Sequence, residues 1–233
     1  MTTITAINRT RFQASSAPDT TPIVFVVDDD ISVRESLELL IQMSGWRAET
    51  FASAREFLAR PRASVPSCVI LDLALPDGSG LDLQQRVAAD RSEMPVIFIT
   101  GHGDVSQSVR AMKAGALEFL TKPFREDVLM SAIRQALERS RRTLEHHAKM
   151  KALRESYQSL TPREREVMVL VVSGFLNKQV GGELGISEIT VKAHRGQVMR
   201  KMKADSLPAL VNMVAGLGLL ADRLDYLHGA LAS

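Results

Sequence analysis

Short apolar runs alternate with longer amphipathic stretches through the first half of the chain. Amphipathic patterns such as 32–43 and 82–90 predict helices. Several of the apolar runs are hydrophobic on both faces, which is typical of parallel strands covered by helices on both sides. Five runs predict strands, at residues 23–27, 47–51, 68–73, 95–99 and 116–120. The first half is therefore expected to form a five-stranded, doubly wound parallel sheet of the α/β class.

After residues 122–124 the pattern becomes entirely helical. One apolar face continues through Leu129 and Leu144, which predicts a long helix from about Glu126 to Tyr157 that joins the two halves. Further along, Thr161-Pro162 and Ser187 are typical helix starts, and Gly174 is a typical helix end. The second half is therefore expected to be all-α.

Composition agrees with two ordinary globular domains. The chain has 233 residues, of which 45% are hydrophobic and 24% charged. The longest nearly apolar stretch, 211–221, is shorter than the roughly 18–20 residues that cross a bilayer. A single cysteine, Cys68, excludes an intramolecular disulfide and fits a reducing cytoplasm. Residues 1–21 lack a secretory pattern and are expected to form a disordered tail.

The net charge of +2 conceals an asymmetry between the halves. Residues 21–136 hold 12 Lys and Arg against 16 Asp and Glu, whereas residues 137–233 hold 15 against 10. An excess of cations favours contact with phosphates, but this excess is small. Whether the second half binds phosphates is therefore judged from its motifs.

Polar residues follow the predicted strands at the edge where parallel strands end. Asp28, Asp29, Asp72, Thr100 and Lys122 would meet at this edge. Converging carboxylates repel one another unless a cation neutralises them, and hard oxygen ligands suit Mg²⁺. With the metal ion and the Lys122 ammonium absorbing charge, Asp72 could attack a phosphorus atom in line. The product would be an acyl phosphate.

Four motifs, VVDDD, LDLALPDGSG, FITGHGD and MKAGALEFLTKPF, together resemble the receiver domains of two-component response regulators, over 22–138. The resemblance implies a flavodoxin-like sheet with strand order 2-1-3-4-5 and Asp72 as phosphoacceptor. It implies further roles, which are Mg²⁺ ligation by Asp28, Asp29, Asp72 and the Ala74 carbonyl, phosphoryl contact by Lys122 and Thr100, and an inward swing of Phe119.

The basic half contains a predicted helix, a tight turn at 185–187 and a second helix. In that second helix Val191, His194, Val198 and Met202 would face the core, with His194 near its rim. A cationic helix of this length fits the major groove of DNA. Predicted DNA contacts are Lys192, Arg195, Gly196 and Met199 on the opposite face, with phosphate contacts from Lys178, His194 and Lys201.

The segments LTPREREV, ELGIS and TVKAHRGQVMRKMKA resemble the four-helix LuxR-type helix-turn-helix, over 158–222. SLPALVNMV would be its fourth, dimer-forming helix. Together with the receiver, this resembles the NarL/FixJ class, with a pattern nearest to FixJ-like regulators. Residues 139–157 would then be a helical linker and 223–233 a C-terminal tail. One departure is Gly181-Gly182, at positions where alanines are usual.

This resemblance implies a phosphorylation-gated transcription regulator in the cytoplasm. A sensor histidine kinase would phosphorylate Asp72, and the phosphorylated protein would dimerise, bind promoter DNA and contact RNA polymerase, without a membrane partner. The only enzymatic chemistry expected is self-phosphorylation and slow self-dephosphorylation at Asp72. An alternative is a receiver-controlled helical module that binds proteins and no specific DNA.

Overall fold

The computed structural model describes residues 20–101 and 105–219. The predicted tails, apart from residues 20–21, lie outside the described residues. The chain divides into two compact units, Met1–Leu144 and Glu145–Ser233. The boundary between the units lies within the predicted linker 139–157. It falls inside one continuous helix, α5 (Glu126–Gln158), whose first half packs in the core of the first unit and whose last turns pack in the core of the second.

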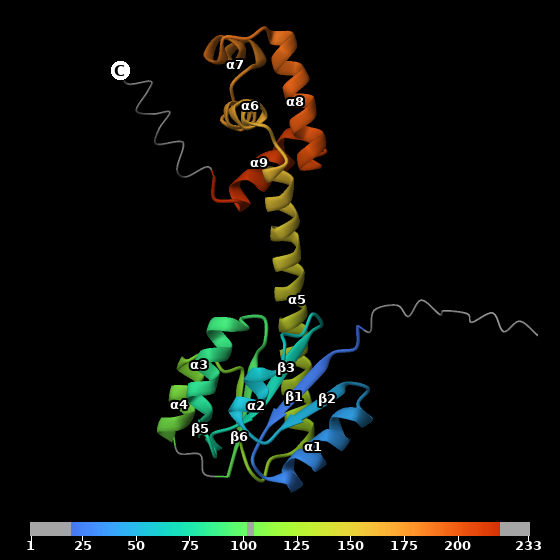
Figure 1. The fold of residues 1–233 in the computed structure, drawn as a ribbon, viewed down its shortest axis with the longest axis vertical. Coiled ribbons are helices and arrows are strands. Elements are labelled where there is room, and N and C mark those ends of the chain that lie inside the picture. Colours follow the sequence, from blue (N-terminus) through green and yellow to red (C-terminus); the bar gives the residue numbers. More distant parts are fainter. Residues whose placement is uncertain (1–19, 102–104, 220–233) are drawn as a thin grey trace, which may run out of the picture. The chain divides into compact units, whose positions relative to one another are not determined.

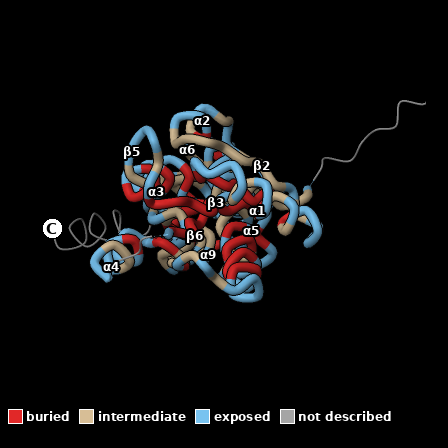
Figure 2. Tube along the Cα trace, turned by 90° about the horizontal axis from the view of Figure 1, so that it is seen from below, coloured by how far each residue is buried: buried red, intermediate tan, exposed pale blue. Residues whose placement is uncertain are grey.

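The first unit is built on a five-stranded parallel sheet (Figure 1). The spatial order β2-β1-β3-β6-β7 confirms the predicted order 2-1-3-4-5 of the parallel strands. The strands are β1 (Ile23–Val27), β2 (Arg47–Phe51), β3 (Ser67–Asp72), β6 (Val96–Thr100) and β7 (Glu118–Thr121). Every residue of β1, β3 and β6 is buried, and the central strands are red in Figure 2. Burial on both faces explains why these runs are continuously apolar.

Helices cover both faces of this sheet. On one face, Val24, Ile70 and Ile97 pack against α1 (Ile31–Met43) and the first half of α5. The other face, with Phe25 and Phe98, packs against three shorter helices, which are α2 (Ala54–Ala59), α3 (Gly80–Asp90) and α4 (Val105–Lys113). The arrangement matches the predicted doubly wound class.

A small antiparallel hairpin follows β3 and was not predicted by the pattern. It pairs β4 (Ala74–Leu75) with β5 (Gly78–Ser79), and strands of two residues are too short to show a period. The Asp77 carboxylate at its turn accepts hydrogen bonds from the N–H groups of Ala54 (3.1 Å) and Arg55 (2.8 Å). The hairpin therefore caps α2, which begins at Ala54.

The second unit is all-α, as predicted. After the last turns of α5 it contains α6 (Pro162–Val172), α7 (Asn177–Leu184), α8 (Glu188–Met202) and α9 (Leu207–Gly216). Thr161 and Glu164 form a complete capping box at the start of α6, and Ser187 caps α8. Val198 and Met202 of α8 enter a core with Leu210 and Val214 of α9. Val191 joins a second cluster with α6 and α7 residues.

The turn between α7 and α8 explains one of the two unusual glycines. A Cβ on Gly181 would lie 2.8 Å from the Ile186 carbonyl oxygen, whereas a Cβ on Gly182 would meet nothing within 4 Å. Gly181 therefore permits the close approach of the turn, and nothing in the fold requires Gly182. Within the described ranges, no helix is long and apolar enough to span a membrane.

Candidate functional site

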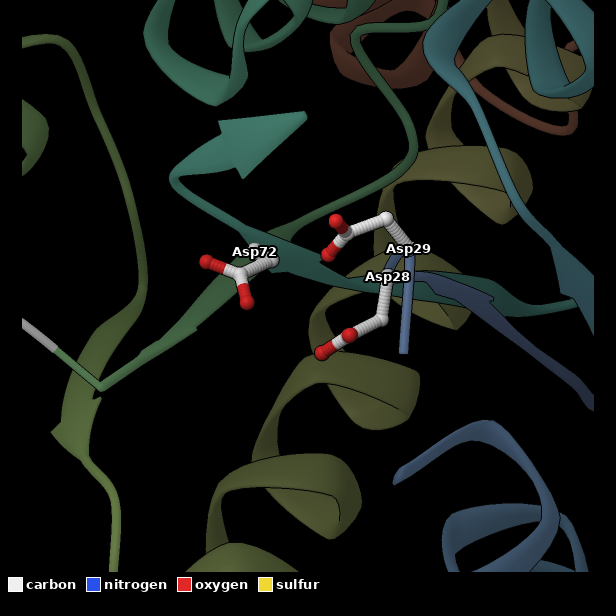
Figure 3. A group of neighbouring side chains, drawn as sticks. All are labelled: Asp28, Asp29 and Asp72. Carbon is white, nitrogen blue, oxygen red and sulfur yellow. The ribbon is translucent and has the colours of Figure 1, made fainter. Parts of the chain in front are cut away.

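Three carboxylates gather at the carboxyl ends of β1 and β3 (Figure 3). One oxygen from each of Asp28, Asp29 and Asp72 can be chosen so that all three lie within 4.8 Å of one another. Asp28 is fully buried and Asp72 is 7% exposed, whereas Asp29 is exposed to solvent. The structure thus brings the three predicted acidic residues together. On the side of the exposed Asp29, the cluster is open to solvent.

Lys122, at the end of β7, bridges two of these carboxylates. Its ammonium donates to Asp28 Oδ2 at 2.7 Å and to Asp72 Oδ2 at 3.0 Å. Burial raises the pKa of the Asp28 carboxyl, and the hydrogen bonds from Lys122 and from the Asp30 N–H oppose that rise only partly. Burial alone would lower the pKa of Lys122, but its two carboxylate partners outweigh burial and raise it. The lysine is therefore a charged counter-ion for a crowded anionic site.

Thr100 and Ala74 lie around the same cavity of about 530 Å³ as Asp28, Asp72 and Lys122. Thr100 ends β6 and is 3% exposed, and the Ala74 N–H donates to Asp72 Oδ1 at 3.1 Å. Phe119 lies on neighbouring β7 with its ring 6.1 Å from that of Phe98. It is half-buried against the hydrophobic core and does not line the cavity.

The exposed face of α8 differs from the predicted one. Val191, Val198 and Met202 are buried, as expected, and His194 is half-buried. The outward face is centred on Ile189, Ala193, Gly196 and Arg200, with Lys192 at one edge. Arg195 and Met199 are only half-exposed, and Met199 packs against the core. The reason is geometric, because successive residues are 100° apart and the side opposite Val191 and Val198 does not include Met199.

Two further predicted DNA contacts have different surroundings. Lys178 is exposed near the start of α7, as a phosphate contact requires. Lys201 instead donates to Glu164 at 2.6 Å and to the Ser159 carbonyl at 3.2 Å. Since Glu164 is 5% exposed, Lys201 neutralises a buried carboxylate and ties α8 to the start of α6. Lys201 is therefore already held in an internal ion pair, and its phosphate contact stays a prediction.

Comparison with known proteins identifies both units. Residues 24–134 match the family model of the response regulator receiver domain, and residues 158–214 match that of bacterial regulatory proteins of the luxR family. The chain is 48% identical to nodulation protein W of Bradyrhizobium diazoefficiens over 206 residues, covering 88% of this chain and 91% of that protein. The chain belongs to the transcriptional response regulators that join a receiver domain to a LuxR-type DNA-binding domain.

Two other comparisons support the same assignment for this response regulator. The transcriptional regulatory protein FixJ of the same Bradyrhizobium strain is 38% identical over 200 residues, covering 85% of this chain and 97% of FixJ. A solved structure of the response regulator StyR is 45% identical, with a TM-score of 0.78, and covers 84% of this chain and 98% of StyR. The predicted FixJ-like pattern is thereby confirmed.

One residue at the receiver site of this response regulator was missed by sequence reasoning. Gly80, the first residue of α3, lies so close to β3 that a Cβ there would be 2.2 Å from the Asp72 carbonyl oxygen. Its N–H also donates to the Leu73 carbonyl at 2.9 Å. A glycine eight residues after an aspartate gives no sequence signal by itself, because the contact depends on how the hairpin returns the chain to β3.

Proposed function

We propose that Asp72 accepts a phosphoryl group from a phosphohistidine of a sensor kinase in the cytoplasm. The observation that carries this proposal is the contact of the Lys122 ammonium with both Asp28 and Asp72, at the edge where the carboxylates converge. This arrangement provides a nucleophilic carboxylate and a fixed cation for the oxygens of the incoming group. Phosphoryl transfer needs mainly such positioning and charge neutralisation.

The same residues fit Mg²⁺. Three carboxylates within 4.8 Å offer only hard oxygen ligands, and among the described residues Lys122 is the cation that pairs with Asp28 and Asp72. We propose that Asp28, Asp29, Asp72 and the Ala74 carbonyl hold the ion. When bound, Mg²⁺ supplies positive charge beside the phosphoryl oxygens.

In the proposed transfer, an Asp72 carboxylate oxygen forms a bond to phosphorus as the phosphorus–nitrogen bond of the kinase phosphohistidine breaks. The departing imidazole keeps the bonding electron pair and takes up a proton from solvent. Lys122 contacts the transferred group, the Thr100 hydroxyl donates to it, and Phe119 turns inward behind Thr100. Small phosphodonors react in the same way, and water slowly hydrolyses the acyl phosphate.

We further propose that phosphorylation promotes a two-fold dimer whose α8 helices enter the major grooves of promoter DNA, where the protein contacts RNA polymerase. Lys192 and Arg195 would contact bases, with Gly196 and Met199 beside them, and Lys178 and His194 would contact phosphates. Arg195 reaches Asn177 Oδ1 at 3.3 Å, so the start of α7 already positions this guanidinium. A guanidinium that is already held in place loses less conformational entropy when it binds a base.

Labelling with a small phosphodonor tests the receiver half. Asp72→Asn should abolish the acyl phosphate, and removal of Mg²⁺ by a chelator should do the same for the wild-type protein. Asp77→Asn is the matched control, because Asp77 is an exposed aspartate of the adjoining hairpin, outside the carboxylate cluster. Labelling of Asp72→Asn at the wild-type level would refute the assignment.

Footprinting on promoter DNA tests the second half. Lys192→Ala combined with Arg195→Ala should abolish the specific footprint, because both side chains are proposed to contact bases, and should leave the nonspecific binding that depends on the phosphate contacts. Lys149→Ala combined with Lys151→Ala removes the same charge from exposed positions of α5 and should leave the footprint unchanged. An unchanged footprint in the first variant would favour the protein-interaction alternative.

A further inference from the structure

Ile189 is an exposed aliphatic side chain in the first turn of α8. It is 80% exposed, and it points away from Val191 and Val198, which are the residues by which α8 enters the core. Most of its apolar surface therefore takes no part in packing within the second unit. A residue of this kind in the first turn of a recognition helix lies where base edges are contacted, since the N-terminal residues of such helices reach furthest into the groove.

Gly196 lies on the same face, two turns further along, and the fold does not require it to be glycine. A Cβ there would meet nothing within 4 Å, and its backbone is in an ordinary helical conformation. Glycine inside a helix costs about 1 kcal/mol relative to alanine. The absent side chain therefore leaves space for something outside this chain to approach the helix closely.

The charges around this face indicate what approaches. Exposed cations lie along this side of α8, with Lys192 one turn after Ile189, Arg200 one turn after Gly196 and Lys203 at the C-terminal end of the helix. Lys192 is paired on one side with Glu188 at 3.0 Å, while no acidic residue of α8 other than Glu188 is present to neutralise the remaining cations. A helix face that carries an apolar side chain together with cations complements the major groove of a DNA duplex, in which phosphates flank the base edges.

The chemistry of that groove leaves one partner for an isoleucine. Base edges in the major groove present hydrogen-bond donors and acceptors, and the C5 methyl group of thymine is their apolar contact. Ile189 has neither donor nor acceptor on its side chain. We propose that Ile189 packs against a thymine methyl group and is a specificity-determining residue that selects A·T over G·C at one base pair of each half-site. This inference rests on the proposed DNA binding.

Replacement of thymine by uracil tests the inference, since uracil differs only by the missing methyl group. The full-length protein, treated with a small phosphodonor, is used to select its binding sequence from random duplexes. Each thymine of that sequence is then replaced singly by deoxyuridine, and dissociation constants are measured by fluorescence anisotropy. At one position per half-site, the wild-type protein should bind about fourfold more weakly to the uracil duplex.

The variants separate this contact from general binding. Ile189→Ala should bind the thymine and uracil duplexes equally, whereas Ile189→Val should keep part of the discrimination. Leu39→Ala, which removes a 61% exposed leucine of α1, should discriminate as the wild-type protein does. Because Ile189 is exposed, its variants should unfold at the wild-type temperature.

Two results would overturn the inference, and they are distinguishable. A sequence-specific footprint with no uracil-sensitive position in the wild-type protein, or with the same sensitivity in Ile189→Ala, refutes the role of Ile189 and leaves the proposed DNA binding intact. Failure to select any sequence at all refutes the proposed DNA binding and the inference with it.

Discussion

Replacement of Gly80 by alanine should disturb the receiver site without changing any of its polar side chains. The new Cβ would lie 2.2 Å from the Asp72 carbonyl oxygen and 3.0 Å from the Leu73 Cα. Both neighbours are backbone atoms, so no side-chain rotation can relieve the contact. Either the start of α3 or the end of β3 must move by about 1 Å to restore an ordinary separation.

The size of the effect follows from two opposing contributions. Overpacking against backbone costs about 1–3 kcal/mol. Replacing a helical glycine by alanine stabilises the folded state by up to about 1 kcal/mol, and by less at the first helical residue. We expect a net loss of about 1–2 kcal/mol in the unfolding free energy of the receiver unit. If the end of β3 moves, the Asp72 carboxylate moves with it, and a misplacement of this size can slow the reaction about 100-fold.

Two measurements check this prediction. Urea unfolding of the receiver is followed by the fluorescence of Trp46, the chain's single tryptophan, which packs against the receiver core. The rate of acyl phosphate formation is measured with a small phosphodonor. Gly182→Ala is the control, because this helical glycine has open space, and the variant should stabilise the second unit by about 0.5–1 kcal/mol. Wild-type unfolding and labelling in Gly80→Ala would refute the close-contact reasoning.

Two further predictions concern contacts that join separate elements. Lys201→Met should destabilise the second unit by about 1.5–3 kcal/mol, measured by urea unfolding, because it removes a charged partner from Glu164. The hydrogen bond from the Lys201 ammonium outweighs burial and, together with the Thr161 hydrogen bonds, holds the pKa of Glu164 below its usual value. The stabilisation by this ion pair is therefore present above pH 4.5 and is lost as pH falls through the lower folded-state pKa. Lys201→Met should flatten this acid dependence, and an unchanged slope would show that the ion pair contributes nothing. Asp77→Ala should lower the urea midpoint of receiver unfolding, because two N–H groups at the start of α2 lose their acceptor. Equal unfolding midpoints for Asp77→Ala and the wild-type protein would contradict this capping role.

Much of the fold follows from local periodicity. The strands β1, β3 and β6 are recognisable because strands buried on both faces need continuous apolar runs. The starts of α6 and α8 are recognisable because a capping side chain acts within three residues. The meeting of Asp28, Asp72 and Lys122 was also predictable, because parallel strands end at a common edge. None of these inferences requires knowledge of how distant side chains pack.

Other features depend on contacts between residues far apart in the chain. Lys201 finds its carboxylate on Glu164, 37 residues away, and Gly80 is confined by the backbone of Asp72 through the return of a hairpin. The orientation of α8 is also a tertiary property, because its buried residues divide between two clusters, one shared with α9 and the other with α6 and α7.

The sequence by itself therefore determined the element types, the sheet order through family resemblance, and the polar residues that meet at the sheet edge. Tertiary structure alone decided that Lys201 pairs with the buried Glu164 and that the Asp72 carbonyl leaves no room for a side chain at Gly80. The physical reason is that helical and strand periodicity shows which residues share a face of one element, whereas contacts between elements depend on how those elements pack.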